Sequence, residues 1–292
     1  MDDMAMGSGD GEFSFPQGVF VDSKSVVVGD CGNNRVCMFD KKTRSFVKTI
    51  PDIQSYHMMT DADSIYLPDF WENRVKVLDS ETLEEKHVFT DLMSPVCVFV
   101  DETHVFIIEQ EGHRLKVFSK ANGWELETTI GTGEWGSYDN MLSSPFGVCA
   151  RSDLVFVSDK SNDRVQVFCR HTWKLLHSIG GRSSVSESVT ATSAGFSWPQ
   201  GMAISDGRLW VADCSNNSVK VFSLPPPMSP EEREAKEQEA ARKAEERRIK
   251  RLEAEVDAAE EKANEELPGA IQMCARVLAA DPSIARAREL ML

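Results

Sequence analysis

One short motif with the residue types of an ion site or an ion pair occurs five times in the chain. Its first copy is GDCGNNRVCMF at 29–39, in which an acid, two amides and an arginine precede an apolar run. The acids that open the five copies are Asp30, Asp69, Glu109, Asp159 and Asp213. Carboxylate and amide oxygens are ligands that Ca²⁺ takes. A single ion on a central axis does not require the motif in every repeat, so we interpret it as a structural turn.

Turn chemistry accounts for the residue types in the motif. The Asp side chain can accept hydrogen bonds from backbone N–H groups two residues further on, and Asn or Gly tolerates a positive φ. The arginine, five residues after the acid, can lay its guanidinium against the Asp of its own repeat or of a neighbouring one. The residues with this structural role are Asp30, Arg35, Asp69, Asp159 and Asp213.

The elements that must hold these turns repeat as well. The opening acids are 39, 40, 50 and 54 residues apart, and a period near 40 is typical of a repeat architecture. Each unit starts with a strand such as PQGVFVD at 16–22, and a short apolar run, the turn and a third strand follow. A weaker fourth strand, such as SFVKTI at 45–50, ends each complete unit. Four short antiparallel strands per unit predict one propeller blade, which buries its two faces by stacking on neighbouring blades.

The repeat resembles the NHL family of β-propellers over about residues 7–224. The stretches that carry the resemblance are FSFPQGVFVD and VVVGDCGNNRVCMF in the first unit, and FSWPQGMAIS and LWVADCSNNSVKVF in the last. We therefore predict an all-β propeller of about five four-stranded blades at 1–224. The second unit departs from the pattern with Ser55 and His57 in place of Pro and Gly. The third has Cys97 for Gly and Gly112–His113 for the Asn pair.

Closure of the ring depends on the N-terminal segment. The fifth unit has only three strands before SLPPPMSP at 223–230. The segment MAMGSGDGEF at 4–13 is similar to the stretches between units. We expect Met4–Met6 to add the fourth strand of the fifth blade and so close the ring. The alternative is an open fragment of a longer ring.

Histidines and cysteines are the remaining candidates for metal or catalytic chemistry. There are six histidines and seven cysteines, no three histidines share a repeat position, and no C-x-x-C pair occurs. Only His57 stands at the start of a predicted innermost strand. A zinc site needs three or four converging ligands, and no P-loop, G-x-S-x-G or H-E-x-x-H signature occurs. We therefore expect a protein that is not an enzyme, with no catalytic residue, no metal and no cofactor.

After the propeller, the composition becomes that of a long charged helix. A Pro-rich linker at 225–230 precedes residues 231–267, which lack Gly and Pro. An apolar seam with heptad spacing runs through 249–263 and consists of Ile249, Leu252, Val256, Ala259 and Ala263. This seam predicts either self-association as a coiled coil or pairing with a partner, and the alternative is a solvated single helix. Residues 268–292 are predicted to form a short helical hairpin.

The turns and the blade-to-blade loops of a four-stranded meander emerge on one face, which we call the loop face. Exposed aromatics with arginine are typical of interaction hot spots. The residues predicted to bind a partner there are Phe70, Trp71, Arg74, Arg114, Trp135, Tyr138, Arg164 and Trp198. The alternative for Trp71 and Trp198 is packing at blade seams. We predict a non-catalytic scaffold or adaptor for a protein partner, and the family resemblance alone adds a ubiquitin-ligase pathway as its setting.

Charge and targeting signals bound the alternatives. Some NHL propellers bind single-stranded RNA on the loop face, so RNA binding is the alternative function. The net charge of −15 makes nucleic acid an unlikely partner, because phosphate backbones require concentrated positive charge. A metal-dependent lyase-like or lactonase-like propeller is the second alternative. No apolar run reaches about 18 residues, and no secretory signal is present. We expect a cytoplasmic protein with free thiols and no membrane partner.

Overall fold

A computed structural model describes residues 7–151, 153–181 and 195–263 of the chain. The chain divides into two compact units, Met1–Pro230 and Glu231–Leu292. The predicted N-terminal strand at Met4–Met6, the serine-rich residues 182–194 and the predicted hairpin at 268–292 lie outside the described residues. No helix in the described part of the chain is long and apolar enough to cross a membrane.

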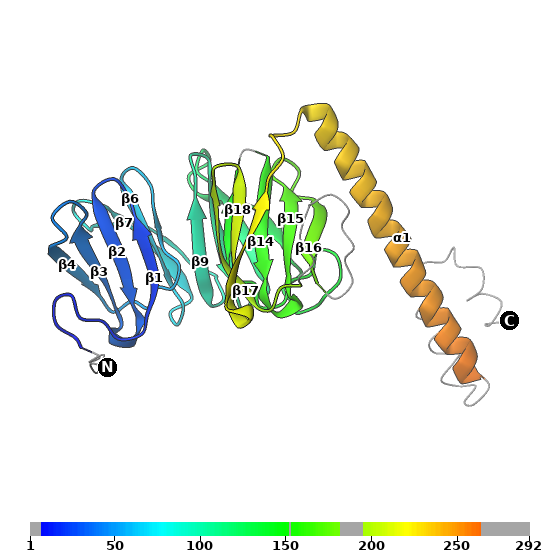
Figure 1. Ribbon diagram of the computed structural model, residues 1–292, viewed down its shortest axis with the longest axis horizontal. Helices are drawn as coiled ribbons and strands as arrows, with labels where there is room; N and C mark the ends of the chain where they lie inside the picture. Colours follow the sequence, from blue (N-terminus) through cyan, green and yellow to red (C-terminus); the bar gives the residue numbers. More distant parts are fainter. Residues whose placement is uncertain (1–6, 152, 182–194, 264–292) are drawn as a thin grey trace. The chain divides into compact units, whose positions relative to one another are not determined.

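The first unit is built from five antiparallel sheets (Figure 1). Blade 1 contains β1 (Pro16–Val21), β2 (Ser25–Asp30), β3 (Arg35–Asp40) and β4 (Phe46–Pro51). Blade 2 contains β5 (Met59–Thr60), β6 (Ser64–Asp69), β7 (Arg74–Asp79) and β8 (Glu85–Phe89). Blade 3 contains β9 (Pro95–Val100), β10 (His104–Glu109), β11 (Arg114–Ser119) and β12 (Glu125–Ile130). Blade 4 contains β13 (Val148–Ala150), β14 (Leu154–Asp159), β15 (Arg164–Cys169) and β16 (Leu175–Gly180). Blade 5 contains β17 (Pro199–Ser205), β18 (Arg208–Asp213) and β19 (Ser218–Ser223).

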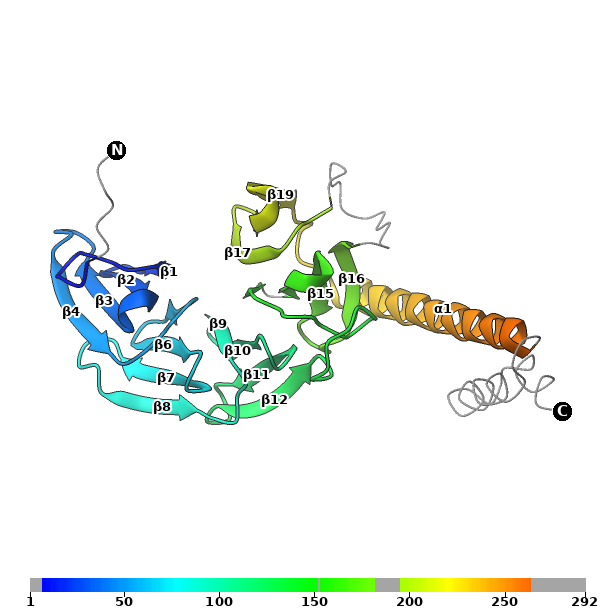
Figure 2. The same cartoon turned by 90° about the horizontal axis from the view of Figure 1, so that it is seen from below.

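Each sheet is a meander whose strands follow one another in sequence order. Figure 2 shows the sheets around an arc, with the first strand of a blade inside and the last outside. The predicted propeller of five blades is therefore confirmed, and so is the missing fourth strand of blade 5 within the described residues. The inner strand of blade 2 is reduced to Met59–Thr60, directly after the departures at Ser55 and His57.

Burial between blades explains why the sequence repeats. Each of the four apolar clusters lies between two consecutive blades. Between blades 2 and 3, for example, Tyr66 and Val75 pack with Val98 and Ile107, and each of the four is at most 4 % exposed. A single sheet would leave both of its apolar faces in water, so each blade stabilises its neighbours through the hydrophobic effect.

The two end blades keep one face uncovered. Val19 of blade 1 is 67 % exposed, whereas Val98, at the same repeat position of blade 3, is 4 % exposed. Val219 of blade 5 is 62 % exposed, whereas its equivalent in blade 2, Val75, is fully buried. In the described residues blades 1 and 5 stand apart across the gap in the arc (Figure 2). The N-terminal closure that the sequence predicts is not part of the described structure.

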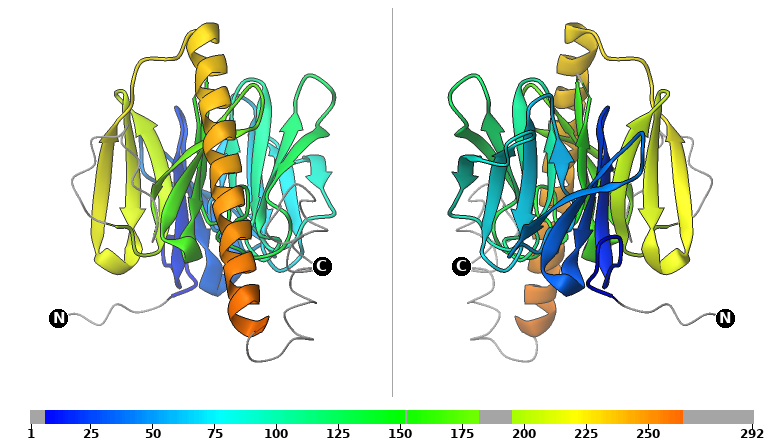
Figure 3. Two further views of the ribbon diagram at one scale, coloured as in Figure 1. Left: turned by 90° about the vertical axis from the view of Figure 1, so that its right-hand side faces the viewer. Right: turned by 90° about the vertical axis from the view of Figure 1, so that its left-hand side faces the viewer.

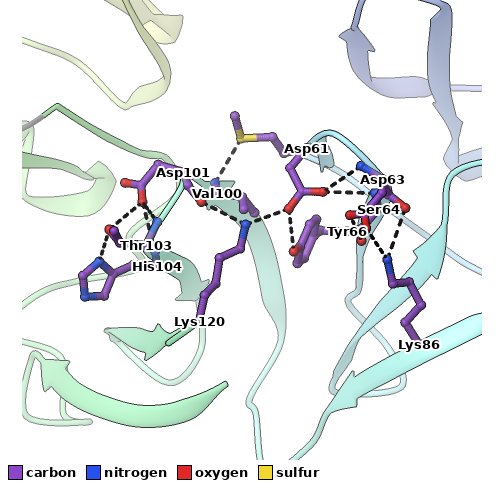
Figure 4. Close-up of polar contacts among 11 residues, drawn as sticks. Asp61, Asp63, Ser64, Tyr66, Lys86, Val100, Asp101, Thr103, His104 and Lys120 are labelled. Atoms are coloured by element: carbon purple, nitrogen blue, oxygen red, sulfur yellow. Dashed lines mark hydrogen bonds and ion pairs between the residues drawn. The ribbon is translucent and has the colours of Figure 1, made fainter. Parts of the chain in front are cut away.

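Ion pairs join neighbouring blades on the face opposite the loop face (Figure 4). Lys120 of blade 3 reaches Asp61 of blade 2 at 2.7 Å and donates to the backbone oxygen of Asp101 at 2.9 Å. Arg170 of blade 4 binds the Asp101 carboxylate of blade 3 in the same manner. Burial alone would raise the pKa of Asp101, but Arg170 and two backbone N–H groups lower it to about 2.

The second unit contains one described helix, α1 (Pro230–Ala263), which runs without interruption (Figure 3). Glu231 and Glu232 lie in its first turn, where negative charge stabilises the helix by interacting with the positive end of its dipole. The prediction of a helix from 231 is confirmed as far as Ala263. In the predicted seam, Leu252 and Val256 are buried and Ile249 is 37 % exposed. Self-association through this seam stays a prediction.

Candidate functional site

The repeated turns follow the predicted backbone but not the predicted role of the acid. The fourth residue after the opening acid is left-handed in every blade, namely Asn34, Asn73, His113, Asp163 and Asn217. The prediction that the acid caps its own turn was wrong where the turn is a 3-10 helix, because the carboxylates of Asp30, Asp159 and Asp213 make no such hydrogen bond. One oxygen of each carboxylate accepts from the side-chain amide of the asparagine three residues on, within the same turn. The other oxygen faces the connector, the segment that joins the outer strand of one blade to the inner strand of the next.

In four blades the opening acid accepts the N–H of the residue sixteen positions before it. The donors are Ser14 to Asp30 at 2.6 Å, Met93 to Glu109 at 2.6 Å, Ser143 to Asp159 at 2.7 Å and Ser197 to Asp213 at 2.7 Å. Each donor lies in the connector. The acid therefore fastens the connector to the turn, and sequence reasoning missed this because the partner is a main-chain group that any residue type can supply.

The arginine of blade 4 completes this fastening. Arg164 donates through Nε to Asp159 at 2.7 Å, so the ion pair lies within its own blade. Its Nη atoms donate to the backbone oxygens of Ser137, Tyr138 and Met141 in the connector, at 2.9, 3.2 and 2.9 Å. Arg164 is buried, and its side-chain nitrogens all donate hydrogen bonds within the protein.

The arginine of blade 1 makes the same set of contacts. Arg35 pairs with Asp30 at 2.8 Å and donates to the backbone oxygens of Ser8, Gly9 and Glu12 at 2.7, 3.0 and 2.9 Å. Residues 7–15 therefore occupy the place that a connector takes in the other blades.

A second cationic position serves blades 3 and 5. Lys116, two residues after Arg114, donates to the backbone oxygen of Asp91 in the connector. In blade 5, Ser218 stands at the position of the arginine. Lys220 takes over its contacts and binds Asp213 and the backbone oxygen of Gly195, both within 2.8 Å. Residues two apart on a strand point to the same side of the sheet, which explains how the lysine takes over the role.

Blade 2 is the exception. Ile53, sixteen positions before Asp69, donates its N–H to the backbone oxygen of Asn34 at 3.3 Å and not to the carboxylate. Arg74 contacts Asp69 at 3.1 Å, and within the described residues neither Arg74 nor Lys76 donates to a connector oxygen. A hollow of about 610 Å³ lies at this turn. Its lining consists of Asn34, Asp52, Gln54, Asp69, Trp71, Glu72 and Arg74.

The two turns also differ in the acidity of their carboxyl groups. Burial alone would raise the pKa of Asp30, but hydrogen bonds from Asn33, Ser14 and Arg35 outweigh it, so this pKa is lowered. Burial raises the pKa of Asp69, and Arg74 and the Gln54 backbone N–H offset only part of the shift. The two carboxyl groups thus differ in whether hydrogen bonds outweigh burial.

Stacked rings hold the indole of Trp71 at the edge of the hollow. Tyr56 packs on Phe70 with ring centroids 5.4 Å apart, and Phe70 packs on Trp71 at 5.0 Å with nearly perpendicular planes. The indole N–H donates to the Gln54 side-chain oxygen at 2.5 Å. Trp71 is 67 % exposed, whereas Phe70 packs partly buried against the core. The side chain is thus oriented although most of it faces solvent.

The other predicted partner-binding residues fall into two groups. Trp135, Tyr138 and Trp198 are 76, 57 and 52 % exposed. Arg164 is buried, and Arg114 pairs with Glu109 of its own turn. The Lys160 ammonium lies 4.9 Å from the ring centre of Trp198, an arrangement that contributes about 0.5–1 kcal/mol at exposed sites.

No group of three potential metal ligands converges among the residues that the structure describes. His57 lies beside Cys97 of the next blade and packs edge-on against Phe146 at 5.2 Å. Its burial lowers the pKa of its ring. The described cysteines are free thiols, and all except Cys214 are buried.

Comparison with known proteins agrees with this geometry. The family model described as the NHL repeat matches residues 196–222, which contain the turn and strands of blade 5. The protein is an NHL-repeat β-propeller. No curated protein is similar enough in sequence to match this propeller.

Two of the matching solved structures share their fold with most of this chain. A streptogramin B lyase structure superposes with a TM-score of 0.54 at 13 % identity, covering 74 % of this chain and 70 % of that one. An auxiliary nutrient binding protein from Bacteroides thetaiotaomicron superposes with a TM-score of 0.60 at 13 % identity, covering 75 % of this chain and 60 % of that one. At this identity the likeness is one of fold.

Proposed function

We propose that this protein is a non-catalytic interaction scaffold or adaptor whose loop face binds a protein partner. The observation that carries the proposal is the exposure of Trp71, Trp135, Tyr138 and Trp198, each more than half accessible to water. Large aromatics on a well-packed support contribute much binding energy at a small entropic cost. The blades that carry these side chains pack against one another as a domain core does, so the surface is preorganised.

The chemistry of the face favours protein over RNA. Single-stranded nucleic acid is bound by stacking bases on aromatic rings inside a positively charged groove. Here Arg35 and Arg164 form ion pairs with acids and donate to connector oxygens, so their charge is largely neutralised by the fold. With a net charge of −15 for the chain, binding to a phosphate backbone would proceed against repulsion.

The setting and the helical arm are parts of the same proposal. Six described cysteines are free, as is usual in a reducing compartment, and we propose a cytoplasmic location. The helix α1 serves as an arm that spaces the propeller or pairs through the 249–263 seam. A role in a ubiquitin-ligase pathway rests on family analogy alone. The activity in the lyase's title belongs to that protein, and we propose no enzyme activity for this one.

Affinity capture with single variants tests the scaffold proposal. Trp71→Ala and Trp135→Ala remove two exposed side chains of the loop face. Leu126→Ala removes a side chain of similar exposure (51 %) on the outer strand β12 and serves as the matched control. We expect a protein that the wild type and the control capture to be lost from both tryptophan variants. If the captured proteins are the same for all four chains, the loop face is not the docking surface.

We also propose that the N-terminal segment closes the ring. The outer strand of blade 3, β12, directly precedes the connector of blade 4, and residues 7–15 hold the connector position of blade 1. By analogy, the segment before residue 7 is proposed to be the missing outer strand of blade 5. Hydrogen exchange tests this proposal. We expect amides of β19 to be protected in the full chain and to exchange faster after deletion of residues 1–6, whereas equal exchange in the two chains would refute closure.

A further inference from the structure

We infer that the hollow at the turn of blade 2 is a peptide site, in which a basic segment of the partner takes the place that a connector takes in the other blades. This inference rests on the proposed function and goes further, because it names one site and the chemistry of its ligand. The juxtaposition that supports it is an exposed, oriented Trp71 beside Arg74, with the acids Asp52 and Glu72 in the same lining.

The first step concerns the backbone of the ligand. In blades 1, 3, 4 and 5 a cationic side chain at the turn donates to a main-chain oxygen of the connector: Arg35, Lys116, Arg164 and Lys220. The sheet therefore carries, in each of these blades, a place for an irregular segment bound by its carbonyl groups. In blade 2 the cationic side chains Arg74 and Lys76 are present at the same positions.

The second step concerns the connector of blade 2. It lies between β4, which ends at Pro51, and β5, which starts at Met59. Ile53 donates to Asn34, Gln54 accepts from Phe70 at 3.4 Å, and the Gln54 N–H acts on the Asp69 carboxylate. Among the described residues no connector oxygen accepts from Arg74, and the hollow lies beside this side chain. A peptide carbonyl can accept from Arg74 without breaking its contact with Asp69.

The third step concerns the side chains of the ligand. Asp69 is balanced by Arg74, so Asp52 and Glu72 leave the lining with excess negative charge. An indole face beside carboxylates is a favourable place for an ammonium or guanidinium group, through cation–π attraction and ion pairing. A ligand that offers carbonyl acceptors along its main chain and a lysine or arginine side chain satisfies both halves of the site.

The test uses the full chain and three fluorescein-labelled probes at low ionic strength. One probe is an acetylated and amidated peptide Gly-Gly-Arg-Lys-Arg-Gly-Gly, the second has Glu at the three basic positions, and the third is an oligouridylate of matched length. Anisotropy is measured for the wild type, for Trp71→Ala and for Leu126→Ala. Leu126 is the matched control because it is exposed and lies outside the lining of the hollow.

We expect the basic peptide to bind the wild type at least tenfold more tightly than the acidic peptide or the oligouridylate. Trp71→Ala should weaken that binding at least tenfold, and Leu126→Ala by less than twofold. Equal binding to the wild type and Trp71→Ala, no binding of the basic peptide, or preference for either other probe would overturn the inference. The proposed scaffold function is judged separately, since capture of a partner that needs Trp135 survives any of these results.

Discussion

Blades 2 and 4 carry the same acid–arginine turn and use it differently. In blade 4 the pair is buried, and the arginine donates hydrogen bonds to three backbone oxygens of the connector. In blade 2 the pair lies at the floor of a hollow and the arginine side chain is 32 % exposed. The connector before blade 4 spans 131–147, whereas the one before blade 2 spans 52–58. The connector of blade 3, at 90–94, is shorter still and is held by Lys116, so the pairing of the connector's main chain, and not its length, distinguishes blade 2.

The largest expected difference between the two turns is in stability. Arg164→Ala leaves the fully buried Asp159 carboxylate without its cation and frees three connector oxygens, so we expect a loss of about 3–5 kcal/mol in the free energy of unfolding. Arg74→Ala also leaves a buried carboxylate, Asp69, but it frees no connector oxygen and Arg74 is itself 32 % exposed, so we expect a smaller loss of about 1–3 kcal/mol. Urea denaturation of the two variants measures this difference. Equal losses would show that the two turns carry the same structural load.

A second comparison tests the end blades by the same method. Val75→Ala opens a cavity between blades 2 and 3 and should cost about 2 kcal/mol. If the ring closes as proposed, Val219→Ala should also destabilise the full chain and should have no effect after deletion of residues 1–6. A Val219→Ala variant that is as stable as the full wild-type chain would contradict closure.

The smallest expected effect is on carboxyl titration. The lowered pKa of Asp30 means that its contribution to stability is complete above the unfolded value of 3.8 and is lost as the pH falls through the folded value. The raised pKa of Asp69 has the opposite sign, because the folded state takes up that proton first and gains stability relative to the unfolded chain as the pH falls toward 3.8. Carboxyl-carbon NMR titration should give Asp69 a pKa above that of Asp30. The reverse order would contradict the inference that hydrogen bonds outweigh burial at Asp30 but not at Asp69.

The sequence predicts the fold well because strands, turns and blade contacts all follow from one repeated pattern. The five meanders, the left-handed position at Asn34 and its equivalents, and the helix start near Pro230 were all predictable from local chemistry. The hollow was not predictable. It depends on which main-chain groups pair at the turn, such as the Phe70 N–H with the Gln54 oxygen, and these leave no mark in residue type. Trp71 was identified from its type, but its orientation by Gln54 needed coordinates.

The difference between the two blades is greatest in the hydrogen bonding of Arg164 and Arg74. Arg164 donates to the connector, whereas Arg74 has N–H groups left that can donate to a ligand. Nitrogen-15 NMR of the arginine guanidinium groups measures this directly through proton exchange with water. We predict slowly exchanging Nη–H groups for Arg164, fast exchange for Arg74 in the free protein, and slower exchange at Arg74 when the basic peptide is added. Equal protection of the two arginines in the free protein would contradict the account.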